Sequence, residues 1–419
     1  RTRSSRRRTI PTSRGPIRAG GSSTRTASGT PSGSRSTSTP WRIEAARAAR
    51  QLSPKEVLDL LKLFPNLATA KLVFRNRGDL TFEEMGAAWG FNTVGISQGM
   101  ALGDMDNDGD LDVVVNNLNE GAGVYRNETG APRVGVRLRG QAPNTQGIGA
   151  KIQVFGGPVP QSQEVICGGR YLSGDDPMRV FAAGSLTNRL RLEVTWRSGR
   201  RSVVSDVPPN WIYEIEEEKA EGQIPESKVQ GPRSKVQGQA EEVKAAGAGR
   251  KDYGIRNTEY GVPLFEDVSP LLNHRHVEEP FEDFDRQPLL PLRLSQLGPG
   301  VCWHDLDGDG WEDVIIGSGK GGQLGVYRNN GQGGFSAIKA GPASRIVTRD
   351  QTAVLGLGGS VVVGSSNYED GLTNGGWIRI YDLPRQVVGD SILGQESSAG
   401  PLAMGDVDGD GDLDLLVGG

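Results

Sequence analysis

Apolar and polar residues alternate along several short stretches of the chain, a pattern typical of half-buried β-strands. Alternation at period two is found at 134–138, 150–155 and 190–196. Short, largely apolar runs follow polar turns at 111–115, 313–316 and 413–417. The first three stretches predict a small β-domain over residues 131–216, and the whole pattern predicts an all-β protein.

A helical period is found in one early segment. Apolar side chains recur at helical spacing between Val57 and Phe64, after an N-cap at Ser53 that is followed by proline. We therefore expect residues 41–67 to form a helical segment that packs between sheets.

Composition separates two segments from the strands. Residues 1–40 are Arg, Ser, Thr, Gly and Pro with almost no apolar side chains, so we expect a disordered basic tail. Such a tail could bind nucleic acid, but no aromatic residue is interleaved, and we expect no nucleic-acid partner. Residues 217–254 are rich in Glu, Lys, Gln and Gly and read as a flexible linker. The 61 glycines among 419 residues suit turn-rich β-structure.

The formal net charge of -4 hides a concentration of aspartate in one motif. Nine residues with Asp at positions 1, 3, 5 and 9 and Gly at position 6 occur at Asp104–Asp112, Asp305–Asp313 and Asp406–Asp414. Carboxylates at this spacing around a tight turn suit a hard cation such as calcium, and without an ion they would repel one another. Position 12 lacks the glutamate of an EF-hand, and a strand-like run follows instead. We therefore expect loops between β-strands.

The surroundings of the loops also repeat. Small residues precede each loop, and Val-Tyr-Arg-Asn follows the first two, at 124–127 and 326–329. A repeating unit of strand, acidic loop, strand, turn and strand is typical of propeller blades. It resembles the FG-GAP/VCBS repeat family, whose calcium-loop blades also occur in integrin α-subunits. The resemblance implies incomplete β-propeller blades at 68–130 and a second, truncated propeller segment at 255–419.

The region between these segments resembles a second family. The order of Asn144–Lys151, Gly169–Ser173 and Val194–Gly199 is similar to the ASPIC/UnbV domain, which follows such repeats in cartilage acidic protein-like chains of bacterial type. Two positions differ from the family pattern: Arg197 replaces the usual proline, and Phe181–Gly184 reads Phe-Ala-Ala-Gly. The resemblance supplies no activity for this domain.

The FG-GAP resemblance implies one calcium ion in each acidic loop. The ligands would be the side chains at positions 1, 3, 5 and 9 and the backbone carbonyl at position 7. These residues are Asp104, Asp106, Asp108, Asp110 and Asp112 in the first loop, Asp305, Asp307, Asp309, Trp311 and Asp313 in the second, and Asp406, Asp408, Asp410, Asp412 and Asp414 in the third. The alternative is an exposed acidic turn that holds no ion.

Other chemistry is weakly represented in the sequence. The histidines are His274, His276 and His304, and we expect a structural or surface role for them. Cys167 and Cys302 are the two cysteines, and we expect both to be unpaired. The sequence contains no nucleophile elbow and no Walker A motif. We therefore assign no catalytic residue and no cofactor besides calcium.

The sequence thus predicts a calcium-stabilised extracellular binding or adhesion protein rather than an enzyme. Its partner would be a protein or glycan at the cell surface, and its location extracellular, periplasmic or at the outer membrane, as the family implies. The alternative is a lyase or hydrolase of extracellular polysaccharide with calcium near its site. No apolar run is long enough to span a membrane. The chain begins at Arg1 without methionine and stops within a blade, so we expect a fragment whose signal peptide is missing.

Overall fold

The computed structural model describes Glu56 and residues 68–218, 263–287, 290, 293–371, 375–389, 392–393 and 396–419. The chain divides into two compact units, Arg1–Phe64 and Pro65–Gly419, and the elements below all belong to the second. The predicted tail, the predicted helical segment except Glu56, and most of the predicted linker lie outside the described residues.

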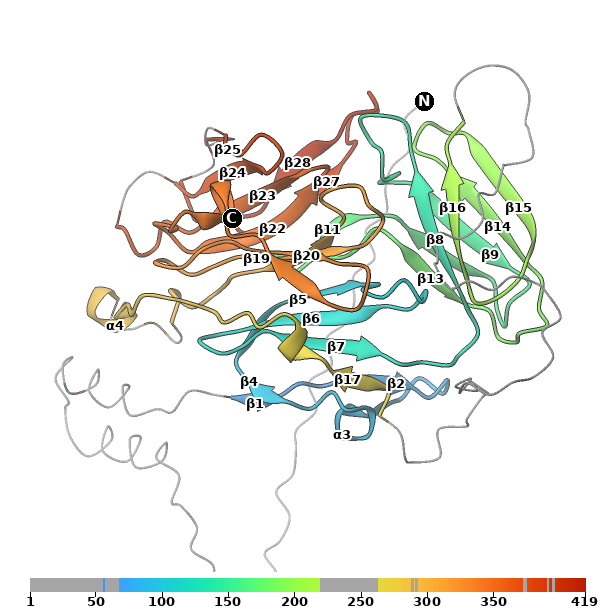
Figure 1. Ribbon diagram of the computed structural model, residues 1–419, viewed down its shortest axis with the longest axis horizontal. Coiled ribbons are helices and arrows are strands. Elements are labelled where there is room, and N and C mark those ends of the chain that lie inside the picture. Colours follow the sequence, from blue (N-terminus) through green and yellow to red (C-terminus); the bar gives the residue numbers. More distant parts are fainter. Residues whose placement is uncertain are drawn as a thin grey trace, which may run out of the picture. The chain divides into compact units, whose positions relative to one another are not determined.

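The first blade is completed by a strand from the far side of the predicted linker. Its four antiparallel strands are β5 (Ser97–Gly103), β6 (Asp112–Asn117), β7 (Gly123–Asn127) and β17 (Phe265–Asp267). Strand β17 pairs with β7, so that Phe265 lies opposite Asn127 (Figure 1). The two predicted propeller segments therefore share one sheet, and the small β-domain is inserted between two strands of the same blade.

Three further groups of strands follow in chain order. The second blade contains β18 (Val301–His304), β19 (Asp313–Ile316), β20 (Gly325–Asn329) and β21 (Phe335–Ala337). The third contains β22 (Gln351–Leu357), β23 (Ser360–Ser365), β24 (Trp377–Asp382), β25 (Val387–Val388) and β26 (Ile392–Leu393). The fourth group is the pair β27 (Leu402–Gly405) and β28 (Asp414–Val417).

Smaller elements lie before and between the blades. Two short pairs precede the first blade: β1 (Thr69–Ala70) with β4 (Val94–Gly95), and β2 (Phe74–Asn76) with β3 (Phe82–Glu84). The described helices are α3 (Gly86–Trp89), α4 (Asp283–Arg286) and the 3₁₀ turns η1 (Ser269–Leu271) and η2 (Gly341–Ser344). None of these described helices is long and apolar enough to cross a membrane.

The small β-domain has two sheets around its own core. One contains β10 (Gln161–Glu164), β9 (Lys151–Phe155), β14 (Leu190–Thr195) and β15 (Arg201–Val207), and the other β13 (Arg179–Ala182), β8 (Arg133–Arg139) and β16 (Trp211–Glu216). Alternate side chains such as Ile152, Val154, Leu192 and Val194 are buried in that core. The period-two pattern of the sequence is therefore the pattern of burial.

One hairpin of this region belongs to the blades instead. It consists of β11 (Cys167–Arg170) and β12 (Ser173–Gly174). Strand β11 pairs antiparallel with β27 (Figure 1). Strand β12 pairs in parallel with β18, so the hairpin joins the second blade to the fourth group. A Cβ atom at Gly300 would lie 1.6 Å from the Leu172 carbonyl oxygen, so only glycine fits there. The predicted small β-domain over 131–216 therefore contains one hairpin whose strand partners lie far along the chain.

The all-β prediction is confirmed, because described strands greatly outnumber described helices. Inner strands of neighbouring blades lie in contact, as β18 does with both β5 and β22. The sheets among the described residues do not close into a ring.

Candidate metal centre

Each acidic loop is the turn between the first two strands of a blade. The loops connect β5 to β6, β18 to β19 and β27 to β28. The first requires left-handed backbone at Asn107 (φ 55°) and Gly109 (φ 88°), where asparagine and glycine are the best-tolerated residues. The other two loops have glycine at both equivalent positions, again with positive φ. The repeated sequence therefore encodes one turn geometry three times.

The turn gathers three carboxylates in each loop. The groups are Asp104, Asp106 and Asp108; Asp305, Asp307 and Asp313; and Asp406, Asp408 and Asp414. Within each group one oxygen from every side chain lies within 4.8 Å of the others. Asp112, Asp309 and Asp410 were predicted as ligands but lie outside these groups. A ligand role for the carbonyls of Asp110, Trp311 and Asp412 stays a prediction.

The aspartate at position 9 connects its loop to the third strand of the blade. Asp112 Oδ2 accepts a hydrogen bond from the Met105 N–H (2.7 Å), and its Oδ1 accepts one from the Asn127 N–H (2.8 Å). Asp313 accepts the equivalent pair of bonds, the second of them from Asn329. The asparagine of the repeated Val-Tyr-Arg-Asn sequence thus has a role that the sequence analysis missed: its backbone N–H donates to this carboxylate, and its side chain donates to a backbone carbonyl of the loop.

Burial raises the pKa of carboxylates in the first loop, and nearby arginines offset only part of this effect. Burial raises the pKa of Asp104 to about 7, although the positive charge of Arg137 opposes the shift. Burial and the charge of Asp108 raise the pKa of Asp106 to about 6. Asp106 Oδ1 is buried without a hydrogen-bond partner. Oxygen donors of this kind, several to a loop, fit a hard divalent cation such as calcium.

The small β-domain contributes an arginine to two of the loops. Arg133 on β8 places Nη2 3.1 Å from Asp110 Oδ2 in the first loop. Arg197, in the turn after β14, donates through Nη2 to the Asp406 carbonyl oxygen (2.9 Å) in the third loop. Arg197 is the residue that replaces the usual proline of the family pattern, and this contact gives it a structural role.

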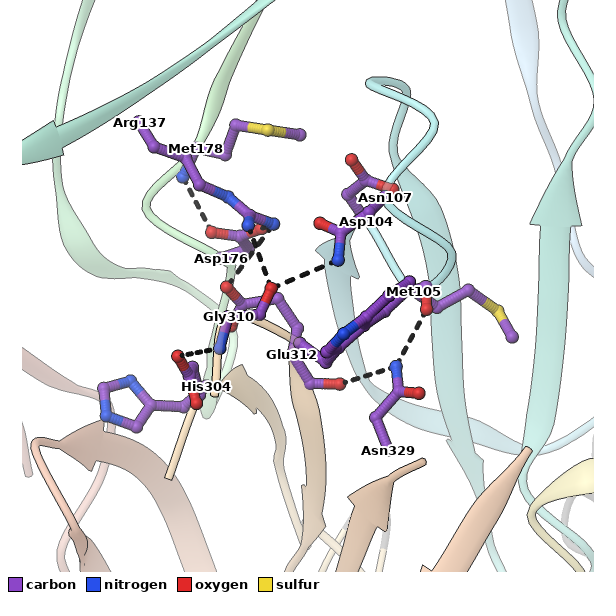
Figure 2. A network of polar contacts seen from close by, with 12 residues as sticks. Asp104, Met105, Asn107, Arg137, Asp176, Met178, His304, Gly310, Glu312 and Asn329 are labelled. Carbon is purple, nitrogen blue, oxygen red and sulfur yellow. Dashed lines mark hydrogen bonds and ion pairs between the residues drawn. The ribbon is translucent and has the colours of Figure 1, made fainter. Parts of the chain in front are cut away.

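A third arginine contacts the second loop from inside a polar network (Figure 2). Arg137 on β8 donates to the Gly310 carbonyl oxygen (3.3 Å), and Asn107 of the first loop donates to the same oxygen (3.1 Å). The Arg137 guanidinium also lies 3.6 Å from carboxylate oxygens of both Asp176 and Glu312. The first two loops and the small β-domain are therefore joined at one point, which the sequence did not indicate.

The histidines and cysteines are not members of the carboxylate groups, although His304 directly precedes Asp305. His274 Nδ1 is 2.8 Å from the Tyr327 hydroxyl, and His276 Nε2 is 2.9 Å from a carboxylate oxygen of Glu278. His304 binds a backbone carbonyl. Among the described residues no carboxylate group of this kind includes a histidine or a cysteine. Both cysteines are free, as predicted.

Comparison with known protein families matches two parts of the chain. Residues 140–222 match the family described as ASPIC and UnbV. Residues 63–115 and 305–356 match the FG-GAP-like repeat, and these two spans contain the first and second acidic loops. A search of curated proteins found no match to the chain. Parts of the chain are therefore similar to FG-GAP-like repeats and to the ASPIC and UnbV domain, in agreement with the resemblance seen in the sequence.

Proposed function

We propose that this chain is an extracellular binding protein whose blades are stabilised by calcium. The observation that carries the proposal is the gathering of three carboxylates within 4.8 Å in each of three equivalent loops. Calcium bound there would neutralise carboxylates that otherwise repel one another across a tight turn. The metal would thus hold together the two strands that flank each acidic loop.

The chain's own residues would extend this effect across the blade. Asp313 belongs to the carboxylate group of the second loop and also accepts hydrogen bonds from backbone N–H groups of the loop and of β20. A metal ion that fixes the Asp313 carboxylate would therefore also fix the loop and β20, whose N–H groups donate to it. This arrangement supports a structural rather than a catalytic role for calcium.

A concave surface beside the second loop supports the binding function. A cavity of about 1020 Å³ is lined by the second loop, by the third blade and by the small β-domain. Arg139, Met178, Leu306 and Asp307 are among its lining residues, so it offers both apolar and charged contacts. We propose that a protein or glycan ligand at the cell surface binds there.

The calcium proposal is tested by thermal unfolding of the full chain in millimolar calcium and in EGTA. With dissociation constants of roughly 10⁻⁴ to 10⁻³ M, calcium would stabilise the fold by about 1 kcal/mol for each loop. Asp307→Asn should lose part of the calcium-dependent increase in melting temperature, whereas Asp206→Asn, an exposed aspartate outside the loops, should keep all of it. An identical melting temperature of the wild type in calcium and in EGTA would overturn the proposal.

A further inference from the structure

A second, smaller cavity lies in the third blade, away from the acidic loops. It has a volume of about 110 Å³ and is bordered by residues 345–349, by Gln351 and by β23 and β24. Its polar lining includes Arg345, Thr348, Arg349, Trp377, Arg379 and Tyr381. None of the described residues that line it is acidic. We call this cavity the arginine pocket.

Arg349 lines the arginine pocket, is held by two contacts, and has one N–H donor group without a partner. It is 6% exposed, and its Nε lies 2.5 Å from a carboxylate oxygen of Asp370. Its Nη1 donates to the Gly375 carbonyl oxygen (3.1 Å). Its Nη2 is buried without a hydrogen-bond partner, which is costly for a charged group. An acceptor in the pocket would remove this cost.

Two further guanidinium groups add positive charge that the protein does not balance. Arg379 stacks on the Trp377 ring, with its guanidinium carbon 4.2 Å from the ring centroid, and Arg349 lies 3.7 Å from the same centroid. Arg345 is exposed at the opening. Within the described part of the chain, neither Arg345 nor Arg379 has a side-chain hydrogen bond or ion pair.

Arg345 and Arg379 line the same small pocket as the Tyr381 phenol. Burial raises the pKa of Tyr381, while a hydrogen bond from Gln351 and the positive charges of Arg379 and Arg345 oppose the shift. The lining of the pocket therefore combines one buried donor without a partner with two positive charges that no described acidic side chain pairs.

We propose that the arginine pocket binds an oxyanion group, a sulfate, phosphate or carboxylate. Guanidinium groups match the geometry of these anions and bind them with charge-assisted hydrogen bonds. Ligand pockets for drug-sized molecules run from roughly 300 to 1,000 Å³, so a cavity of about 110 Å³ suits a single anionic group. The group is either a free inorganic anion or a substituent on a glycan. This site is independent of calcium in the acidic loops.

The test is a titration of the full chain at constant ionic strength, followed by tryptophan fluorescence because the guanidinium groups stack on Trp377. Sodium sulfate, galactose 6-sulfate and glucuronate are titrated separately, with chloride as the balancing anion. Wild-type protein should bind at least one of them saturably. Arg379→Gln and Arg345→Gln should each weaken that binding by roughly tenfold or more. Arg385→Gln, in the same blade but 83% exposed and paired with Asp382, should leave it unchanged.

The three arms distinguish the source of the anion. Tighter binding of a sugar acid or sugar sulfate than of inorganic sulfate would assign the pocket to an acidic glycan, and equal affinity would assign it to the free anion. Circular dichroism shows whether each variant is folded. If one variant does not fold, the other still tests the proposal. The proposal is wrong if no anion binds saturably, or if both variants bind as tightly as Arg385→Gln.

Discussion

At the scale of single residues, the position-9 aspartates hold the turn together whether or not a metal binds. Asp112 is fully buried, and both of its oxygens accept backbone N–H groups, from Met105 on one side and Asn127 on the other. The Asn127 side chain in turn donates to the Leu111 carbonyl oxygen (3.3 Å). These bonds fix the loop against β7, so the carboxylates at positions 1, 3 and 5 are gathered by the fold itself.

This gives a prediction for Asp112→Asn. The amide that replaces one carboxylate oxygen is a donor, so it would face a backbone N–H with no acceptor. We expect a loss of about 1–3 kcal/mol in the free energy of unfolding, measured by urea denaturation in EDTA so that metal does not contribute. Asp206→Asn is the matched control. An unchanged urea midpoint for Asp112→Asn would show that the hydrogen bonds accepted by Asp112 do not stabilise the fold.

His274 predicts a dependence of stability on acid. Burial, with a smaller effect of the charge of His276, lowers the pKa of His274 to about 4, so the folded protein holds it neutral. The unfolded chain takes up a proton near pH 6.5, so stability falls as the pH is lowered from 6.5 toward 4. Between pH 7 and 5 the wild type should lose about 2 kcal/mol more than His274→Gln. Urea denaturation at both pH values measures this, and equal losses would contradict it.

The sequence predicted the carboxylates of the candidate metal site, but it did not predict the arginines that contact the loops. The spacing of Asp104, Asp106 and Asp108 indicated the cation site because their neighbours in sequence are also their neighbours in space. The contacts of Arg133 and Arg137 with the loops were not predicted. A polar residue on an alternating strand does not indicate which distant loop its side chain will contact.

At the scale of elements, the β11–β12 hairpin shows where sequence patterns fail. The strand predicted at 313–316 is observed as β19, since a buried apolar run next to a turn is a local signal. The hairpin pairs Gly174 with Cys302 and Cys167 with Met404, partners far along the chain. Short, Gly-rich strands with such nonlocal partners have no periodicity to detect.

The close approach at this hairpin predicts the effect of Gly300→Ala. The added Cβ atom would overlap the backbone of Leu172, which cannot move without disturbing β12. Overpacking of this kind should cost about 1–3 kcal/mol or more and lower the melting temperature. Gly405→Ala is the control, because nothing lies within 4 Å of a Cβ atom at that position in β27. Equal melting temperatures of the two variants would count against the packing described for the hairpin.

At the scale of the whole molecule, the small β-domain and the blades form one connected structure within the described residues. The domain is inserted between β7 and β17 of the first blade, contributes a hairpin to the blades, and contacts each acidic loop through an arginine. The order of the family patterns along the sequence predicted both parts. It did not predict this interweaving, because the family pattern at Gly169–Ser173 does not show that the hairpin pairs with strands far along the chain, and β17 carries no family motif.

The arginine contacts predict local protection of the third loop. Arg197→Gln removes the hydrogen bonds to the Asp406 carbonyl oxygen, so backbone amides of residues 406–414 should exchange with deuterium roughly two- to tenfold faster. Hydrogen–deuterium exchange with mass spectrometry measures this on the full chain. Arg189→Gln, which removes an exposed arginine of the same domain, should leave the exchange unchanged. The same exchange in both variants would mean that Arg197 does not secure the loop.

The most direct test of calcium in the acidic loops is to count the ions that the chain binds. Equilibrium dialysis against a series of ⁴⁵Ca²⁺ concentrations, extrapolated to saturation, should give three ions per chain, one for each of the carboxylate groups. Asp106→Asn, Asp307→Asn and Asp408→Asn should each lower that number by one. A wild-type chain that binds no calcium under these conditions, or a triple variant that binds as much as the wild type, would contradict the account.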